Sequence, residues 1–188
     1  MATRSKSKPA AVHAGRAAAG WRRPRLQVGA LCWRLSGKGL RVLLITSRET
    51  GRWVIPKGWP MKKRTDWEAA AREAWEEAGV EGEVSPVPIG LYTYRKVLPG
   101  GVWIPCAVRV FPLRVVSMRR EYPETNLRSN RWFSPRKAAR RVAEPELAAL
   151  IRAFDPGAAD APPATAAPGP EAEEAPESDT PPKGRQTS

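Results

Sequence analysis

Residues 65–79 predict one amphipathic helix set among β-rich runs, and this arrangement restricts the folds that the chain can adopt. Thr65 is a suitable N-cap residue, and Glu68 three positions later completes a capping box. Gly79 supplies a C-terminal stop. Runs rich in Val, Leu and Ile lie before and after this helix. We therefore expect an α+β fold around a mixed sheet.

The flanking segments carry their own turn and cap signals. A hairpin is indicated where Ser, Gly and Lys at 36–39 separate two β-rich runs. Ser134-Pro135 is typical of a helix start, with the serine as N-cap and the proline at the first helical position. The expected strands lie within residues 26–35, 40–48, 52–59, 82–98 and 101–116, and helices begin near 66 and 135 and cover 144–154.

Composition divides the chain of 188 residues into three parts. Residues 1–23 are basic and rich in Ala, Ser and Pro, which predicts a disordered arm. Residues 156–188 consist mainly of Pro, Ala and Glu and contain no aromatic residue, so this tail cannot bury enough apolar surface to offset its ordering entropy. The folded domain is expected to span residues 24–155.

The net charge of +13 predicts attraction to phosphates, nucleic acid or anionic surfaces. No run of 18 or more apolar residues is present, so we expect no membrane span. The first acid is Glu49, and the basic start resembles an organellar transit peptide weakly. We favour a basic arm on a cytoplasmic protein. Cys32 and Cys106 lie in apolar runs, which favours two buried, unpaired thiols in a reducing compartment.

Three carboxylates share one side of the predicted helix. On a helical wheel, Glu76 and Glu77 fall within 60° of Glu73, since each residue turns the helix by about 100°. Like charges at these spacings repel, and a bound divalent cation would reverse the sign of that interaction. Spacing alone favours a metal site and a solvated acidic face equally. The opposite side is expected to pack through an apolar stripe of Trp67, Ala71, Ala74, Trp75 and Ala78.

The wider segment decides between these interpretations. Gly58, the pair Arg72-Glu73, the pair Glu76-Glu77 and the final Gly79-Val80 fall in the register G-x5-E-x7-R-E-U-x-E-E-x-G-U. This pattern resembles the Nudix box. The chain departs from it at Arg64, where the box has glutamate, and this puts in doubt a role for a fourth box carboxylate.

The resemblance implies a Nudix-like α/β/α sandwich and hydrolysis of a phosphoanhydride bond with Mg²⁺ or Mn²⁺. It implies that Glu76 and Glu77 are metal ligands and that Glu73 is a ligand or the general base. Arg72 would orient the acidic pair, and Gly58 and Gly79 would shape the loop and the helix end. Metal ions supply this chemistry by polarising phosphate and lowering the pKa of water.

Basic residues surround the start of the box, and their arrangement indicates either a cradle for several substrate phosphates or a solvated surface. With the neighbouring PKGW and WFSP segments, they look similar to the branch of the family that acts on diphosphoinositol and diadenosine polyphosphates. We name them the basic cluster: Arg48, Arg52, Lys57, Lys62, Lys63 and Arg64. Glu121 and Glu124 are candidates for a further metal contact.

Two classes of function remain open. The first is a metal-dependent pyrophosphohydrolase that acts on a phosphorylated small molecule. The second is a catalytically weak Nudix-fold module that binds RNA or regulates, suggested by the net charge and by Arg64. The intact set of Glu73, Glu76 and Glu77 favours the enzyme, so binding to nucleic acid is possible but not favoured.

Overall fold

The computed structural model describes residues 23–98 and 100–159. The predicted basic arm, apart from residue 23, and the predicted tail beyond residue 159 lie outside the described residues. Within the described part, the elements run along the chain as β1 (Arg25–Ser36), β2 (Gly39–Thr46), β3 (Trp53–Val54), β4 (Lys57–Gly58), α1 (Asp66–Ala78), β5 (Val80–Val84), β6 (Gly90–Val97), β7 (Trp103–Met118), β8 (Asn130–Phe133), α2 (Pro135–Ala139), α3 (Pro145–Ala153) and α4 (Pro156–Ala159).

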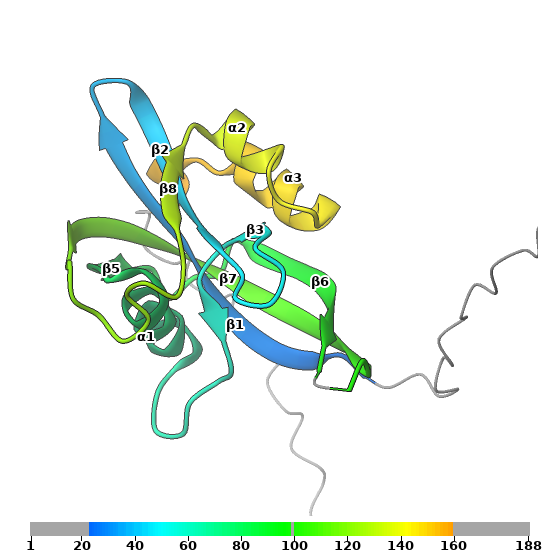
Figure 1. The fold of residues 1–188 in the computed structure, drawn as a ribbon. Helices are drawn as coiled ribbons and strands as arrows, with labels where there is room; N and C mark the ends of the chain where they lie inside the picture. Colours follow the sequence, from blue (N-terminus) through cyan, green and yellow to red (C-terminus); the bar gives the residue numbers. More distant parts are fainter. Residues whose placement is uncertain (1–22, 99, 160–188) are drawn as a thin grey trace, which may run out of the picture. The chain divides into compact units, whose positions relative to one another are not determined.

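The strands form one mixed sheet with β1 near its middle (Figure 1). β1 pairs in parallel with β7 and antiparallel with β2 and with the short β4. β5 and β6 pair with β7, while β3 and β8 pair with β2. The pairing with β4 is important for the site, because it holds Gly58 beside Val28 in the centre of the sheet.

Alternation along β1 shows that both faces of the sheet are covered. Val28, Ala30 and Cys32 point into the core beneath α1. Leu31 and Trp33 are buried on the other face, where the Trp33 ring lies 5.8 Å from that of Phe154 after α3. The domain is therefore an α/β/α sandwich, in agreement with the expected fold class.

Most local signals in the sequence correspond to observed structure. The capping box of Thr65 and Glu68 is formed, and Gly79 ends α1 in the left-handed region with φ of 66°. The hairpin at residues 36–39 joins β1 to β2. Ser134 occupies the N-cap position of α2, although its side chain makes no capping hydrogen bond. Cys32 and Cys106 are both buried and free, as predicted.

No helix in residues 23–98 and 100–159 has the length and apolar character that a membrane crossing requires.

Candidate active site

The packing face of α1 differs from the predicted one. Its buried residues are Ala69, Ala70, Ala74, Glu77 and Ala78. The predicted stripe is confirmed for Ala74 and Ala78. It is wrong for Trp67, Ala71 and Trp75, which are half-buried at the edge of the packing face. Alanine side chains allow a helix to approach a sheet closely, whereas two tryptophans on one stripe would hold it away. The helix is consequently rotated so that Glu73 and Glu77 face the junction between helix and sheet.

Glu73 fills the space that a side chain at Gly58 would need. A Cβ atom added to Gly58 would lie 1.9 Å from Oε1 of Glu73, which gives a physical reason for glycine at this position. Burial is the main cause that raises the pKa of Glu73 to about 7, and the charges of Glu77, Glu76 and Glu124 add to it. Glu73 therefore lies in a region of excess negative charge that the protein only partly neutralises.

Glu77 is more deeply placed, with 6% of its surface exposed. One carboxylate oxygen accepts a hydrogen bond from the backbone N–H of Lys57 at 3.0 Å, and the other accepts one from the Arg128 guanidinium. Burial raises the pKa of Glu77, while the charges of Lys57 and Arg128 oppose that rise. The two partners thus hold Glu77 in a fixed orientation between α1 and β4.

Arg128 is a site residue that the sequence analysis missed. Its side chain is only 7% exposed and bridges Glu77 to Glu124, whose carboxylate lies 2.5 Å from Nε. A third bond, of 3.0 Å, goes to the backbone oxygen of Thr46. The i,i+4 spacing of Glu124 and Arg128 was the available signal, but such pairs are common on exposed surfaces.

Glu124, and not Glu121, lies beside the box carboxylates. Its charge contributes to the raised pKa of Glu73, and its backbone N–H donates to the Glu76 carbonyl oxygen at 3.0 Å. Glu121 is exposed and makes no hydrogen bond among the side chains that the structure describes. Arg72 holds Glu76 through an i,i+4 bond of 2.5 Å, and its guanidinium lies 4.2 Å from the centre of the Trp75 ring.

The acidic side chains have the chemistry of a magnesium site, although their present arrangement is not that of a formed one. Among the described residues, no three His, Cys, Asp or Glu side chains are grouped so that they could hold a metal ion directly. Both Glu77 oxygens are engaged by Lys57 and Arg128, whereas both Glu73 oxygens make no hydrogen bond. Hard cations prefer carboxylate oxygen, so the donor set fits Mg²⁺ if Arg128 shifts.

The basic cluster does not form one continuous cradle. Arg48 pairs with Glu124 at 3.3 Å. Arg52 and Lys57 lie together near the ring of Tyr94, at 5.8 Å and 5.7 Å from its centre. Burial is the main cause that lowers the pKa of the half-buried Lys57. Arg48 and Lys57 therefore contact the acidic side chains of the site, whereas Arg52 donates a hydrogen bond of 2.8 Å to the buried Glu144 at the start of α3.

The remaining members of the basic cluster lie elsewhere. Lys62 and Lys63 are exposed in the turn before α1, where Lys63 has φ of 63°. Arg64 lines a groove with Glu68, Arg72 and Trp75, on the side of α1 opposite to Glu73. Arg64 therefore lies away from the site, and Glu68 is held in the capping box by Thr65, so neither residue supplies the fourth carboxylate of the box.

Residues 24–154 match the family model described as the NUDIX domain. The Arabidopsis thaliana protein named "Nudix hydrolase 12, mitochondrial" is 34% identical over 106 residues, which cover 53% of this chain and 50% of that protein. The chain spans about half the length of the first curated relatives that it matches.

Two solved structures share the fold. The crystal structure of Caenorhabditis elegans Ap4A hydrolase superposes with a TM-score of 0.53 at 19% identity, over 69% of this chain and 95% of that one. The Escherichia coli dihydroneopterin triphosphate pyrophosphohydrolase gives a TM-score of 0.54 at 17% identity, over 70% of this chain and 97% of that one. At these identities the likeness concerns the fold alone.

Proposed function

The chain belongs to the Nudix family, and on that premise we propose that it is a pyrophosphohydrolase that depends on a divalent cation and cleaves a phosphoanhydride bond. The observation that carries the proposal is the environment of Glu73. This carboxylate is half-buried against Gly58, accepts no hydrogen bond from the residues that the structure describes, and has its pKa raised by the charges of three further carboxylates. Such a concentration of negative charge disfavours the folded state unless a proton or a cation neutralises it.

In this proposal Glu73, Glu76 and Glu77 hold the cation, with Glu124 as a fourth carboxylate. The bound cation would polarise a phosphate oxygen and lower the pKa of water. Arg72 positions Glu76 through its bond of 2.5 Å. Glu73 is either the third ligand of the cation or the general base that accepts a proton from the attacking water, and in the absence of a cation its pKa is raised to about 7.

Arg128 is a positioning residue in the same proposal. It fixes Glu77 and Glu124 relative to each other, and through Thr46 it ties both of them to β2. Its guanidinium also compensates two carboxylates while the cation is absent. A cation held by Glu77 would need an oxygen that now accepts a hydrogen bond from Arg128 or from the backbone of Lys57.

The proposed substrates are dinucleoside polyphosphates or diphosphoinositol polyphosphates. Lys57 and Arg48 lie beside the acidic side chains, and Arg52 lies near Lys57 at the ring of Tyr94. Arg48 and Arg52 are paired with Glu124 and Glu144, and a substrate with several phosphates would compete for them better than a single diphosphate. The Caenorhabditis elegans protein of similar fold is named for hydrolysis of Ap4A. That name is consistent with the proposed substrate class.

A catalytically weak Nudix module is the second candidate. One observation favours it, because both oxygens of Glu77 already accept hydrogen bonds from the chain itself. A silent module would keep this arrangement when Mg²⁺ is added. An enzyme would exchange part of it for the cation.

Separation of the cleavage products by anion-exchange chromatography tests the proposal. The full-length protein is incubated with Mg²⁺ and a dinucleoside polyphosphate, a diphosphoinositol polyphosphate, a nucleotide sugar or a nucleoside triphosphate. We expect the two polyphosphates to be the best substrates. Absence of Mg²⁺-dependent cleavage of every one of these compounds would favour the silent module.

A charge-removal series tests the substrate class separately. Arg52→Ala should raise KM several-fold for the polyphosphates and less for a nucleotide sugar, because Arg52 faces the region beside Lys57 and Tyr94. Arg120→Ala, which removes an exposed cation elsewhere, is the control and should leave KM unchanged. An equal effect of both changes on all substrates would show that the basic residues near the site do not select the substrate.

The cytoplasm is the proposed compartment. Two buried, unpaired thiols suit a reducing environment. The Arabidopsis relative carries the word mitochondrial in its name. A fluorescent protein fused behind residues 1–30 would distinguish the two compartments, and a mitochondrial signal would overturn the proposal.

A further inference from the structure

A second groove lies between the β1–β2 turn, β8 and α2, apart from the acidic side chains of α1. Its volume is about 620 Å³, and it is open to solvent along one side. Six of its lining side chains are cationic, and none of the described residues that line it is acidic. The lining consists of Lys38, Arg41, Arg131, Trp132, Phe133, Ser134, Lys137, Arg140 and Arg141.

The cations of this groove are not neutralised within the described part of the chain. None of the six forms a salt bridge with a described acidic side chain. Seven arginines elsewhere in the domain do form such pairs: Arg48, Arg52, Arg72, Arg109, Arg114, Arg119 and Arg128. Other described Lys and Arg side chains also form no salt bridge, but the groove brings six such cations together without a carboxylate in its lining. A surface of this kind attracts a polyanion.

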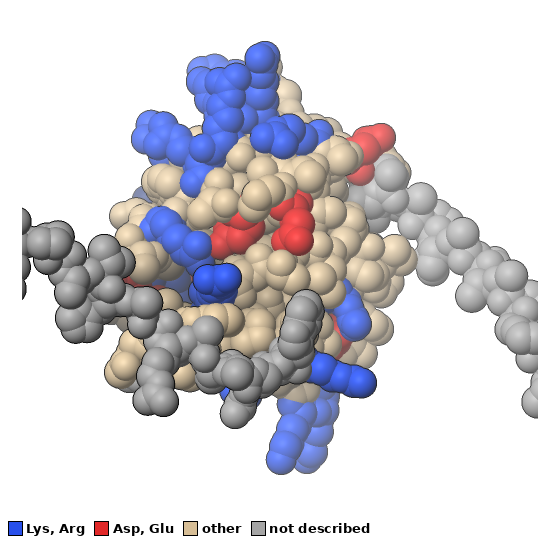
Figure 2. Space-filling model, turned by 90° about the vertical axis from the view of Figure 1, so that its right-hand side faces the viewer, with Lys and Arg blue, Asp and Glu red and all other residues tan. Residues whose placement is uncertain are grey.

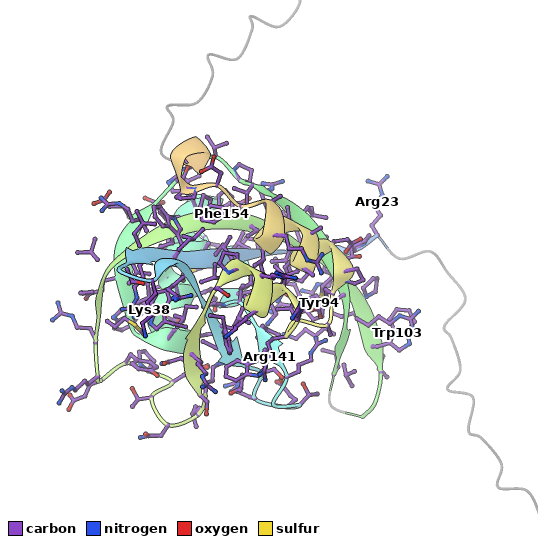
Figure 3. All side chains as sticks on the ribbon, turned by 90° about the horizontal axis from the view of Figure 1, so that it is seen from above. Arg23, Lys38, Tyr94, Trp103, Arg141 and Phe154 are labelled. Atoms are coloured by element: carbon purple, nitrogen blue, oxygen red, sulfur yellow. The ribbon has the colours of Figure 1, made fainter. Side chains whose placement is uncertain are left out.

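The figures show the same gathering of charge. Lys and Arg side chains crowd the upper end of the molecule in Figure 2, at the height of the β1–β2 turn and α2 in Figure 1. Seen from that end, Lys38 lies on the side away from Trp103 at the tip of the β6–β7 hairpin, and Arg141 lies between them (Figure 3). Lys and Arg side chains are also visible at the lower end in Figure 2, so the upper end is one of the places where positive charge gathers.

Aromatic side chains lie among the cations. Trp132 is half-buried: part of it packs against the core beneath α1, part lines the groove, and the guanidinium of Arg34 lies 4.1 Å from the centre of its ring. Phe133 is buried and points to the other face of β8, with the guanidinium groups of Arg131 and Arg141 at 5.8 Å and 5.7 Å from its ring centre. Grooves that bind single-stranded nucleic acid combine these two features, because the cations follow the phosphates and the aromatic rings stack on bases.

β8 connects the groove to the acidic site without merging the two. Arg128 in the acidic site lies two positions before the start of β8, and Asn130 lies opposite Ile45. Phe133, at the other end of β8, lies opposite Val42. Two residues lie between them, so Phe133 is roughly 10 Å further along the sheet than Asn130.

We propose that this groove binds single-stranded nucleic acid through its phosphates and through stacking on Trp132. Cations alone would serve a small polyphosphate or an anionic membrane equally well, but the part of Trp132 that lines the groove adds an aromatic surface, on which a base would replace the Arg34 guanidinium. The proposal does not depend on catalysis, since none of the groove residues contacts Glu73, Glu76 or Glu77.

The first test measures the affinity of the full-length protein for a fluorescein-labelled oligouridylate of 20 nucleotides with a 5′-hydroxyl. This RNA has no phosphoanhydride bond, so the proposed hydrolase site has no bond to cleave in it. The groove variant combines Arg131→Glu with Arg140→Glu, and the matched control combines Arg120→Glu with Arg152→Glu, which reverse the same number of exposed charges elsewhere. Fluorescence anisotropy at several salt concentrations reports binding.

We expect the groove variant to lose at least tenfold in affinity and the control to stay within about threefold of the wild type. The slope of log K against log salt should also become shallower by about 1.4 in the groove variant, because each phosphate contact to a single strand contributes about 0.7. Equal losses in both variants would overturn the proposal, since net charge alone would explain them. If the glutamate variant fails to fold, Arg131→Gln with Arg140→Gln takes its place.

The second test separates nucleic acid from other polyanions. Trp132→Leu keeps an apolar side chain but removes the stacking surface, so RNA affinity should fall about fivefold or more while binding of inorganic polyphosphate stays constant. Equal weakening of both ligands would reduce the groove to a general anion site and overturn the assignment. Anionic lipid vesicles form the last arm, and loss of vesicle binding without loss of RNA binding in the groove variant would assign the groove to a membrane surface instead.

Discussion

Glu73 combines three unusual properties in one side chain. It is half-buried, and it makes no hydrogen bond among the described residues. The charges of Glu77, Glu76 and Glu124 repel its own. The pKa is raised to about 7, so at neutral pH this carboxyl is poised between its protonated and charged forms. A group in that state is suited either to bind a cation or to exchange a proton.

The raised pKa of Glu73 predicts how stability depends on pH. Between about pH 4.5 and 7 the folded carboxyl keeps a proton that the unfolded one has lost, so the free energy of unfolding decreases as pH rises through this window. Because Glu73 is partly exposed, we expect a loss on the order of 1 kcal/mol. Urea unfolding in EDTA at pH 5 and pH 7.5 measures it, and Glu73→Gln should remove this part of the dependence. The assignment would be contradicted if the free energy of unfolding changed equally between pH 5 and pH 7.5 in the wild type and in Glu73→Gln.

Gly58→Ala tests the contact between β4 and Glu73. The new Cβ atom would overlap the Glu73 carboxylate, which lies at the flexible end of its side chain and can move aside. We therefore expect the protein to fold with little change in Tm and turnover to fall by about two orders of magnitude. Gly37→Ala is the matched control, because no atom lies within 4 Å of the Cβ position there. Wild-type turnover in Gly58→Ala would show that the Glu73 position is not critical.

The sequence was sufficient to bring Glu73, Glu76 and Glu77 together, because helical periodicity is a local property. It was not sufficient to show that Glu77 is buried or that Arg128 holds it. Those facts depend on the rotation of α1 against the sheet and on a loop 51 residues further along the chain. Contacts at such separation leave no periodic signal in a single sequence.

At the scale of elements, the segment between β7 and β8 is tied to α1 by polar contacts. The backbone N–H of Glu124 donates to the carbonyl oxygen of Glu76, and Arg128 reaches Glu77. Both ends of these contacts lie at the proposed metal site. The cation would therefore bind at a junction between two elements and would stabilise their association.

Arg128→Ala should be costly and should depend on the cation. Removing one partner of a buried ion pair leaves uncompensated carboxylates, which costs about 3–5 kcal/mol. Bound Mg²⁺ would supply the missing positive charge, so the loss measured by urea unfolding should be smaller with Mg²⁺ than with EDTA. The control is Arg114→Ala, which breaks an exposed pair with Glu83 and should cost no more than about 1 kcal/mol. A loss for Arg128→Ala that is unaffected by Mg²⁺ would contradict a shared site.

Element boundaries followed from turn and cap chemistry, and the packing face did not. Thr65 and Gly79 marked the ends of α1 because their roles depend only on adjacent residues. The apolar stripe was predicted from hydrophobicity, which ranks tryptophan above alanine. The observed face uses Ala70 and Ala74 because the distance between helix and sheet is set by side-chain size.

For the whole molecule, the order of the strands in the sheet was the property that the sequence predicted least well. The parallel pairing of β1 with β7 joins segments that are about 80 residues apart. Hydrophobic alternation shows that each segment is a strand but carries no information on its partner. The fold class followed from the order of elements, while the sheet topology required the structure.

The two tails predicted from the sequence should be dispensable for folding and for catalysis. Residues 22–156 contain the apolar segments of the sequence, and the flanking parts are poor in large apolar residues. A chain of residues 22–156 should keep the Tm and the turnover of the full-length protein. Tm from thermal unfolding and turnover from chromatography of the cleavage products are measured for both proteins. Loss of either property would show that a flanking segment contributes to the fold or to substrate binding.

The central claim is that the acidic side chains of α1 hold a cation that drives hydrolysis. It is tested most directly by Mg²⁺-dependent cleavage of the best polyphosphate substrate, followed by chromatography of the products, for the wild type, Glu76→Gln and Glu77→Gln. Each change keeps the shape of the side chain and removes one ligand charge. We expect turnover to fall by at least two orders of magnitude in both variants while the far-ultraviolet circular dichroism spectrum stays that of the wild type. Turnover near the wild-type value in both folded variants would contradict the account.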